Sequence, residues 1–314
     1  MTSIPNQRGS FVGLDYAQSG VQVCVLDSSG RVLANRLCRN DWRSIQRVAT
    51  RFGPVRRAAV EACCGAADLA EELVERARWL VDLARVGYLP RVWLAPETIR
   101  ELRRLTRYRQ QQVNQRRAIK LRILAVLREQ RIRQPTCTRW CGPWLSWLTT
   151  DAPLSEQARW VVERWLRHLA FVSGEIDHVM QRLRELLAED PVAAKLQSLP
   201  GIGEVTAFTL RAEIGRFDRF HCGKQLSRFC GLSPRNASSG ERQADAGLIR
   251  AANGQLRSIV IEAAHRLARY DARWSAMRHR LRTAGKPGSV IAGAVGNRWL
   301  RWLYHEMKPL SQAA

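Results

Sequence analysis

The stretch FVGLDYAQSGVQVCVLDSSGRVLANRLC, residues 11–38, decides the fold of the N-terminal part of this chain. Its apolar residues recur with a period of two, which is typical of strands that bury one face. These residues are Val12, Leu14, Val21, Val23 and Val25. The segment DSSG at 27–30 is rich in turn-forming residues. The stretch therefore predicts strand, turn, strand, turn, strand.

Helical and strand patterns alternate after this stretch. We expect a helix at 41–51, a strand at 56–65 (RRAAVEACCG), a helix at 66–78 and a strand at 79–84 (WLVDLA). The order of three strands, helix, strand, helix and strand describes a ribonuclease-H-like sheet. Other α/β folds fit the same order.

Two acidic residues lie at informative points of this predicted sheet. Asp15 falls inside the apolar first strand, where an unpaired carboxylate is costly, and Glu61 closes the fourth strand. In a ribonuclease-H-like sheet these strands are neighbours, so both carboxylates could converge on Mg²⁺, which prefers oxygen ligands. The alternative is a turn-capping aspartate and a glutamate in a surface salt bridge. Spacing alone favours the alternative, because the motif is weak.

The charge of the chain indicates a polyanionic partner. The sequence has 314 residues, with 51 Lys and Arg against 28 Asp and Glu, which gives a net charge of +23. Arginine far outnumbers lysine, and its planar guanidinium binds phosphate in a bidentate manner and stacks on bases. A GC-rich genome would explain the preference for arginine but not the net charge. We therefore expect nucleic-acid binding.

The eight cysteines have no paired CxxC spacing, which argues against structural zinc. The sequence also shows no signal-peptide pattern and no long apolar run. We expect a reduced cytoplasmic protein, associated with the nucleoid and without a membrane partner.

The middle of the chain predicts a long basic arm. Residues 95–131 lack glycine and repeat apolar residues at helical spacing, and a second helical pattern covers 153–188. A Trp- and Cys-rich turn at 137–148 would join them into an antiparallel arm or coiled-coil hairpin. A run of charge is usually a solvated face, but few acids balance this one. We expect its arginines to contact the RNA or DNA backbone: Arg103, Arg104, Arg107, Arg109, Arg116 and Arg117.

The last third contains LPGIGEVTA at 199–207, which is typical of a helix-hairpin-helix turn. In such a turn Gly201 and Gly203 would let backbone N–H groups approach a phosphate. The alternative is a tight turn between two helices. Residues 254–269 predict a further helix with Leu256, Ile259, Val260 and Ala263 facing inward.

Several segments together resemble the DEDD transposases of bacterial insertion sequences. They are GLDYA, AAVEACCGAADLAEEL, GYLPRVWLAPETIRELRRL, LPGIGEVTA, FCGLSPRNASSG and GQLRSIVIEAA, in the family's order along nearly the whole chain. The resemblance implies an α/β RuvC-like domain at 1–95, a helical arm at 96–190 and a mainly helical C-terminal transposase domain at 191–314.

The resemblance also implies a chemistry and a set of partners. The serine directly before glycine in the SSG segment, here Ser239, attacks DNA in that family. Without the resemblance this segment would be an ordinary turn. Arg235 and Arg242 lie nearby in sequence and could neutralise charge that builds on the phosphate. The implied partners are DNA (element ends and target), a structured guide RNA and further copies of the chain, as a dimer or tetramer with a composite site.

The chain departs from the family at the metal site. The family has four acids, of which Asp15 and Glu61 match two. The other two form an Asp-x-x-Asp pair, and the segment that carries it is missing between Ala84 and Arg85. We therefore expect Mg²⁺ to bind weakly and recombination to be reduced or lost.

Two rival functions use the same features. One is a non-enzymatic RNA- or DNA-binding relic of such a transposase, which would share all its binding surfaces. The other is a Holliday-junction nuclease with a RuvC-like site. The nuclease is disfavoured because it needs the full set of acids and explains neither the arm nor the serine segment.

Overall fold

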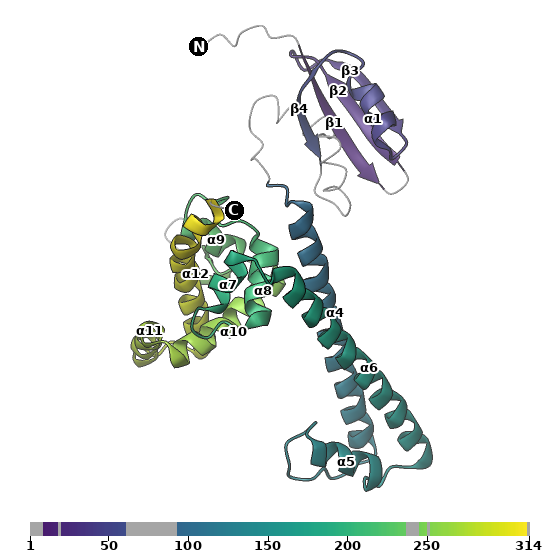
Figure 1. The fold of residues 1–314 in the computed structure, drawn as a ribbon, viewed down its shortest axis with the longest axis vertical. Coiled ribbons are helices and arrows are strands. Elements are labelled where there is room, and N and C mark those ends of the chain that lie inside the picture. Colours follow the sequence, from purple (N-terminus) through teal and green to yellow (C-terminus); the bar gives the residue numbers. More distant parts are fainter. Residues whose placement is uncertain (1–8, 18–19, 61–92, 237–244, 250–251, 313–314) are drawn as a thin grey trace. The chain divides into compact units, whose positions relative to one another are not determined.

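The computed structural model describes residues 9–17, 20–60, 93–236, 245–249 and 252–312. The chain divides into two compact units, Met1–Ala95 and Pro96–Ala314 (Figure 1). The second unit contains both the helices of the predicted arm and those of the predicted C-terminal domain.

The described part of the first unit is a mixed sheet with the helix α1 packed against it. Its described elements are β1 (Ser10–Ala17), β2 (Gly20–Leu26), β3 (Val32–Cys38), α1 (Trp42–Ala49) and β4 (Val55–Val60). The strand order is β3-β2-β1-β4, with β1 antiparallel to β2 and parallel to β4. The three strands predicted within 11–38 and the following helix are confirmed, and the strand predicted at 56–65 is confirmed as far as Val60; residues 61–65 lie outside the described residues. The helix and strand predicted at 66–84 lie outside the described residues.

The alternating apolar residues of 11–38 form the core of this unit. Val12 and Leu14 of β1 and the valines of β2 are buried against Ile45 and Ala49 of α1. The predicted turn is present between β2 and β3: the Asp27 carboxylate accepts the N–H groups of Ser29 (2.8 Å) and Arg31 (3.0 Å). Gly30 has a φ of +88°, a conformation that favours glycine.

The arm is an antiparallel pair of long helices, α4 (Glu97–Glu129) and α6 (Glu156–Leu187), as predicted (Figure 1). Their seam buries Ile119, Ile123 and Leu127 of α4 against Val162, Val172 and Ile176 of α6. Apolar residues three and four apart form a stripe along each helix, so two such helices bury it by packing together.

The connection at the end of the arm differs from the prediction. Instead of a plain turn at 137–148, the structure has the helix α5 (Gly142–Thr150), with Pro143 in its first turn. Trp144 and Leu148 are four residues apart, lie on one face of α5 and are fully buried against the seam. Burial of this short apolar face stabilises a helix that the turn-rich composition does not predict.

The remaining elements form a helical domain around the last helix. They are α7 (Pro191–Gln197), α8 (Glu204–Ile214), α9 (Gly223–Phe229), β5 (Pro234–Asn236), β6 (Asp245–Leu248), α10 (Gly254–Tyr270), α11 (Ala272–Thr283) and α12 (Gly288–Gln312). Helix α12 packs against α7, α9, α10 and α11, while α8 packs against α4, α7 and α10. The inward face predicted for 254–269 is confirmed, with Leu256, Val260 and Ala263 buried and Ile259 half-buried.

Within the described ranges, no helix is long and apolar enough to span a lipid bilayer.

Replacing Trp144 by alanine should destabilise the helical unit by about 3–5 kcal/mol, because it leaves a large cavity at the end of the arm. The matched control is Trp160→Ala on α6, since Trp160 is 57% exposed, and its cost should stay below about 1 kcal/mol. Urea unfolding followed by far-UV circular dichroism measures both. Equal losses for the two variants would contradict the proposed role of α5.

Candidate functional site

The predicted nucleophile lies between two strands whose positions are defined. Strands β5 and β6 are antiparallel and pair Pro234 with Leu248 and Asn236 with Asp245. Residues 237–244, which include Ser239 and Arg242, are outside the described residues. Arg235 lies on β5 and is exposed. We refer to β5, β6 and the segment between them as the serine hairpin.

Partly buried polar contacts hold the base of the serine hairpin. The Asn297 amide on α12 donates to the Ser227 hydroxyl (2.7 Å) and to the Leu232 carbonyl (2.8 Å), just before β5. At the other end, the Arg257 guanidinium on α10 donates to the Ile249 carbonyl, just after β6. Helices α10 and α12 therefore position both ends of the hairpin.

Gly231, which precedes the hairpin, is required by the same packing. Its φ is +75°, and a Cβ at this position would lie 2.6 Å from the Arg257 guanidinium and 2.7 Å from the Ala252 side chain. A larger residue would displace the arginine that fixes the hairpin.

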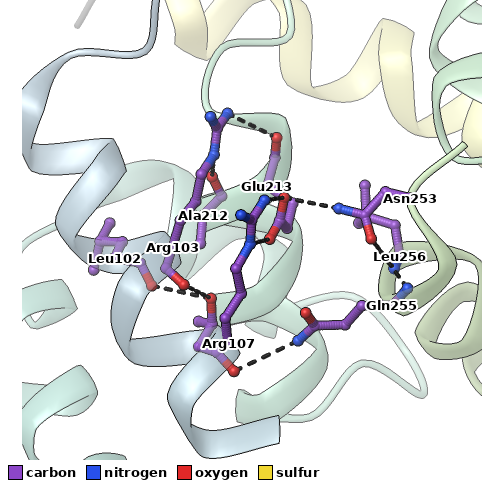
Figure 2. A network of polar contacts seen from close by, with 9 residues as sticks. Leu102, Arg103, Arg107, Ala212, Glu213, Asn253, Gln255 and Leu256 are labelled. Atoms are coloured by element: carbon purple, nitrogen blue, oxygen red, sulfur yellow. Dashed lines mark hydrogen bonds and ion pairs between the residues drawn. The ribbon is translucent and has the colours of Figure 1, made fainter. Parts of the chain in front are cut away.

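A buried carboxylate lies at the junction of the arm and the C-terminal helices (Figure 2). Glu213 on α8 is only 2% exposed. The Arg107 guanidinium on α4 donates to both of its carboxylate oxygens, at 2.7 and 3.0 Å, and the Asn253 amide donates to Oε2 at 2.8 Å. A buried charge is tolerated when it is paired and hydrogen-bonded. The partners of this carboxylate come from α4 and from the start of α10, so both elements are joined to α8 at Glu213.

Asn253 also forms the N-cap of α10. Its side-chain oxygen accepts the N–H groups of Gln255 (3.0 Å) and Leu256 (3.2 Å), which have no partner within the helix. One side chain thus joins the start of α10 to Glu213. This contact therefore positions the start of α10, the helix that follows the serine hairpin in the sequence.

Arg103 adds a second link between α4 and α8. Its guanidinium donates to the carbonyls of Ala212 (2.8 Å) and Glu213 (3.1 Å) in the last turn of α8, where carbonyls lack helical partners. Burial lowers the pKa of Arg103, whereas the hydrogen bonds to Glu213 raise the pKa of Arg107. Figure 2 shows both arginines reaching from α4 to the same end of α8.

Four of the six arm arginines thus have partners within the protein. Besides Arg103 and Arg107, Arg104 donates to Glu97 (3.0 Å) and Arg109 donates to the Met180 sulfur (3.0 Å). Further along α4, Arg116 is half-buried and Arg117 is exposed. Binding of nucleic acid by the arm remains a prediction, and Arg116 and Arg117 are now the best residues with which to test it.

Behind α8, Arg219 occupies an aromatic environment. Its guanidinium lies 4.4 Å from the Phe220 ring centre and 4.5 Å from that of Phe229, and it donates to the Ile214 carbonyl (3.0 Å). Burial, with a contribution from the nearby Arg103 charge, lowers the pKa of Arg219 to about 10. Burial raises the pKa of the neighbouring Cys230 thiol to about 12, so this cysteine is protonated and not a nucleophile.

The predicted glycine turn connects α7 to α8. Gly201 has a φ of +75°, and Gly203 is the N-cap residue of α8. Arg266 on α10 donates to the Gly201 carbonyl (3.2 Å) and the Thr206 hydroxyl (3.2 Å). The turn between two helices is therefore observed, and phosphate binding by its N–H groups remains a prediction.

Of the two predicted metal ligands, only the backbone of Asp15 is described. Asp15 pairs with Gln22 of β2, and its neighbour Leu14 pairs with Val60, the last residue of β4. Glu61 follows Val60 in sequence and lies outside the described residues. In the part of the chain that the structure describes, no three His, Cys, Asp or Glu residues are grouped so that they could hold a metal ion.

Sequence reasoning missed Glu213, Asn253 and Asn297. The one available signal was an acidic residue in the apolar helix EVTAFTLRAEI, where an unpaired carboxylate is as costly as in a strand.

Replacing Glu213 by glutamine should destabilise the helical unit by about 2 kcal/mol, because it removes the charge that pairs with Arg107 and leaves an amide in its place. The matched control is Glu185→Gln on α6, whose exposed carboxylate pairs with Arg182 and should contribute less than about 0.5 kcal/mol. Thermal unfolding of the full chain measures the difference. If both variants lose the same small amount of unfolding free energy, the buried carboxylate does not join the helices as described.

Part of the helical unit is similar to known proteins. Residues 193–280 match the family described as "Transposase IS116/IS110/IS902 family". The chain is 34% identical over 90 residues to the transposase for insertion sequence element IS1111A of Coxiella burnetii, which covers 29% of this chain and 25% of that protein. It is 26% identical over 193 residues to the transposase y4qE of Sinorhizobium fredii, covering 59% of this chain and 45% of that protein.

A third relative, the transposase for insertion sequence element IS1328 of Yersinia enterocolitica, is 26% identical over 104 residues, or 33% of this chain and 31% of that protein. The matched segments thus cover from 25% to 45% of the length of these relatives. The family match at 193–280 contains the glycine turn, Glu213, the serine hairpin and Asn253. Over these residues the chain is similar to the insertion-sequence transposases of the IS116/IS110/IS902 family.

Proposed function

We propose that this protein is a DNA transposase that cuts and rejoins DNA with Ser239 as nucleophile, assisted by Mg²⁺ at Asp15 and Glu61 and guided by a structured RNA. The observation that carries the proposal is the family match at 193–280, which encloses the serine hairpin and Arg257, one of the two residues that hold its base. A nucleophile must be held in a fixed geometry, and a hairpin anchored at both ends meets that need.

The proposed reaction transfers a phosphorus–oxygen bond from DNA to the protein. The Ser239 oxygen forms a bond to phosphorus, the bond from phosphorus to one DNA oxygen breaks, and the hydroxyl proton leaves to a base. The negative charge that builds on the phosphate must be neutralised. Arg235 on β5 is exposed and Arg242 lies within the hairpin sequence, so both are candidates for that contact.

The topology of the first unit supports the proposed metal site. The parallel strands β1 and β4 pair at Leu14 and Val60, and the residues that follow these two in the sequence are Asp15 and Glu61. Carboxylate oxygens are ligands that Mg²⁺ accepts together with phosphate and water. When bound, the ion would withdraw charge from a phosphate oxygen. With two acids in place of four, we expect weak binding of Mg²⁺ and slow recombination.

The missing Asp-x-x-Asp segment favours a second candidate, a relic that binds RNA or DNA without cutting it. The two candidates share every binding surface and differ only in covalent chemistry. A covalent protein–DNA adduct therefore separates them.

Wild-type protein incubated with DNA containing an element end and Mg²⁺ should form a covalent adduct, and Ser239→Ala should abolish it while DNA binding is kept. Ser238→Ala is the matched control and should retain most of the adduct, since its hydroxyl is one position from the proposed nucleophile. Denaturing gel electrophoresis of labelled DNA measures the product. Equal adduct in wild type and Ser239→Ala would remove Ser239 as nucleophile, and no adduct from wild type would favour the relic.

DNA binding should weaken steeply with salt, because a cationic protein that neutralises phosphates releases counterions. Replacing Arg116 and Arg117 together by glutamine should lower the slope of log K against log salt by about 2. Arg182→Gln is the control, because Arg182 already pairs with Glu185 (3.2 Å). Fluorescence anisotropy at several salt concentrations measures the slopes, and a wild-type slope near zero would exclude phosphate contacts as the source of affinity.

A further inference from the structure

Helices α11 and α12 enclose a groove of about 870 Å³ whose lining is strongly basic. Six of the lining residues carry the inference: Arg273, Arg280, Arg298, Arg301, Trp302 and His305. The groove is separate from the serine hairpin residues and from the arm arginines, and no function has so far been attached to it.

Helical spacing explains why these side chains gather. On α12, Arg298, Arg301, Trp302 and His305 are three, four and seven residues apart, which places them on one face. The opposite face of α12 is buried in the domain through Val295, Trp299, Leu303 and Met307. Arg273 and Arg280 of α11 are seven residues apart and share a face in the same way. The two basic faces therefore meet across the groove.

The charge of the groove is not balanced by acids. The sequence of α11 contains no acidic residue, and that of α12 contains only Glu306. The four groove arginines are exposed, and among the described residues none of them forms an ion pair with a carboxylate. Like charges held this close repel one another, so a polyanion in the groove would relieve the repulsion as well as gain attraction.

The groove also presents an aromatic surface. Trp274 is 5% exposed and Trp302 is half-buried, and both residues line the groove. The Arg273 guanidinium lies 4.9 Å from the Trp274 ring centre and 6.0 Å from that of Trp302. An open indole among guanidinium groups can stack on a nucleobase while the arginines bind the flanking phosphates.

We propose that this groove binds an unpaired stretch of DNA, with one base stacked on Trp302 and the adjoining phosphates on Arg298 and Arg301. Bases in a duplex are stacked inside the helix and cannot reach an indole in a groove, so the aromatic surface selects unpaired nucleotides. The choice of DNA rests on the proposed function, because a transposase must handle DNA strands that are separated for cutting and rejoining.

The test uses the full chain and labelled oligonucleotides of about 16 nucleotides: single-stranded DNA, RNA of the same sequence and the DNA duplex. Trp302→Leu should weaken binding of single-stranded DNA about tenfold and change duplex binding by less than about twofold, because only an unpaired base loses its stacking partner. Arg298→Gln with Arg301→Gln should weaken both forms of DNA and reduce the salt slope by about 2. Fluorescence anisotropy gives the affinities.

Trp160→Leu is the matched control, since Trp160 is exposed on α6 with the Arg164 guanidinium 5.3 Å from its ring centre. It should leave single-stranded DNA binding unchanged. If Trp302→Leu does not fold, the variant Arg298→Gln with Arg301→Gln still tests the groove. Both arginines are exposed, so replacing them leaves the core intact.

Each contrary outcome has a distinct meaning. If wild type binds DNA but neither groove variant affects single-stranded binding, the groove proposal is wrong while the proposed function stands. If Trp302→Leu weakens RNA binding more than DNA binding, the occupant is RNA and the DNA assignment is wrong. If wild type binds no DNA at all, the proposed function itself fails.

Discussion

The helical unit depends on one buried negative charge. Glu213 is almost completely removed from water, so its carboxylate must be compensated by the protein, and the compensation comes from Arg107 on the arm and Asn253 at the start of α10. Removing either partner would leave part of the carboxylate unpaired. The arm, α8 and α10 are therefore held at one point by electrostatics and around it by apolar packing (Figure 2).

Because some arginines bind groups inside the protein, the arginine surplus does not act only on an external partner. A net charge of +23 predicts a polyanionic partner, yet several arginines are used inside the protein. Arg103 caps the end of α8, Arg211 pairs with Asp190 at 2.7 Å, and Arg219 packs against two neighbouring phenylalanine rings. The charge available to a partner is concentrated elsewhere, above all on α11 and α12, where acids are nearly absent. Counting charges along the chain does not separate these two uses.

The serine hairpin shows how a scaffold prepares a site. Its two ends are tied to different helices by Asn297 and Arg257, and the residue before it must be glycine because Arg257 occupies the space of a side chain. The described residues on both sides of the segment that carries Ser239 are thus held by the helical domain. The proposed metal ligands belong to the other compact unit, where β1, which contains Asp15, pairs with β4, which ends at Val60, the residue before Glu61 in the sequence.

The sequence by itself determined the strands within 11–38, the two long arm helices and the inward face of α10. Each depends on a local period of two or about 3.6 residues, which the chain displays without reference to distant segments. Only the tertiary structure decided that α5 replaces a turn, because its stability comes from burying Trp144 and Leu148 against the arm. It alone decided that Arg107 faces Glu213, 106 residues away, and that the basic faces of α11 and α12 enclose a groove. The physical reason is that periodicity states which side of a helix is apolar or charged, while the neighbour of that side is set by how the helices pack.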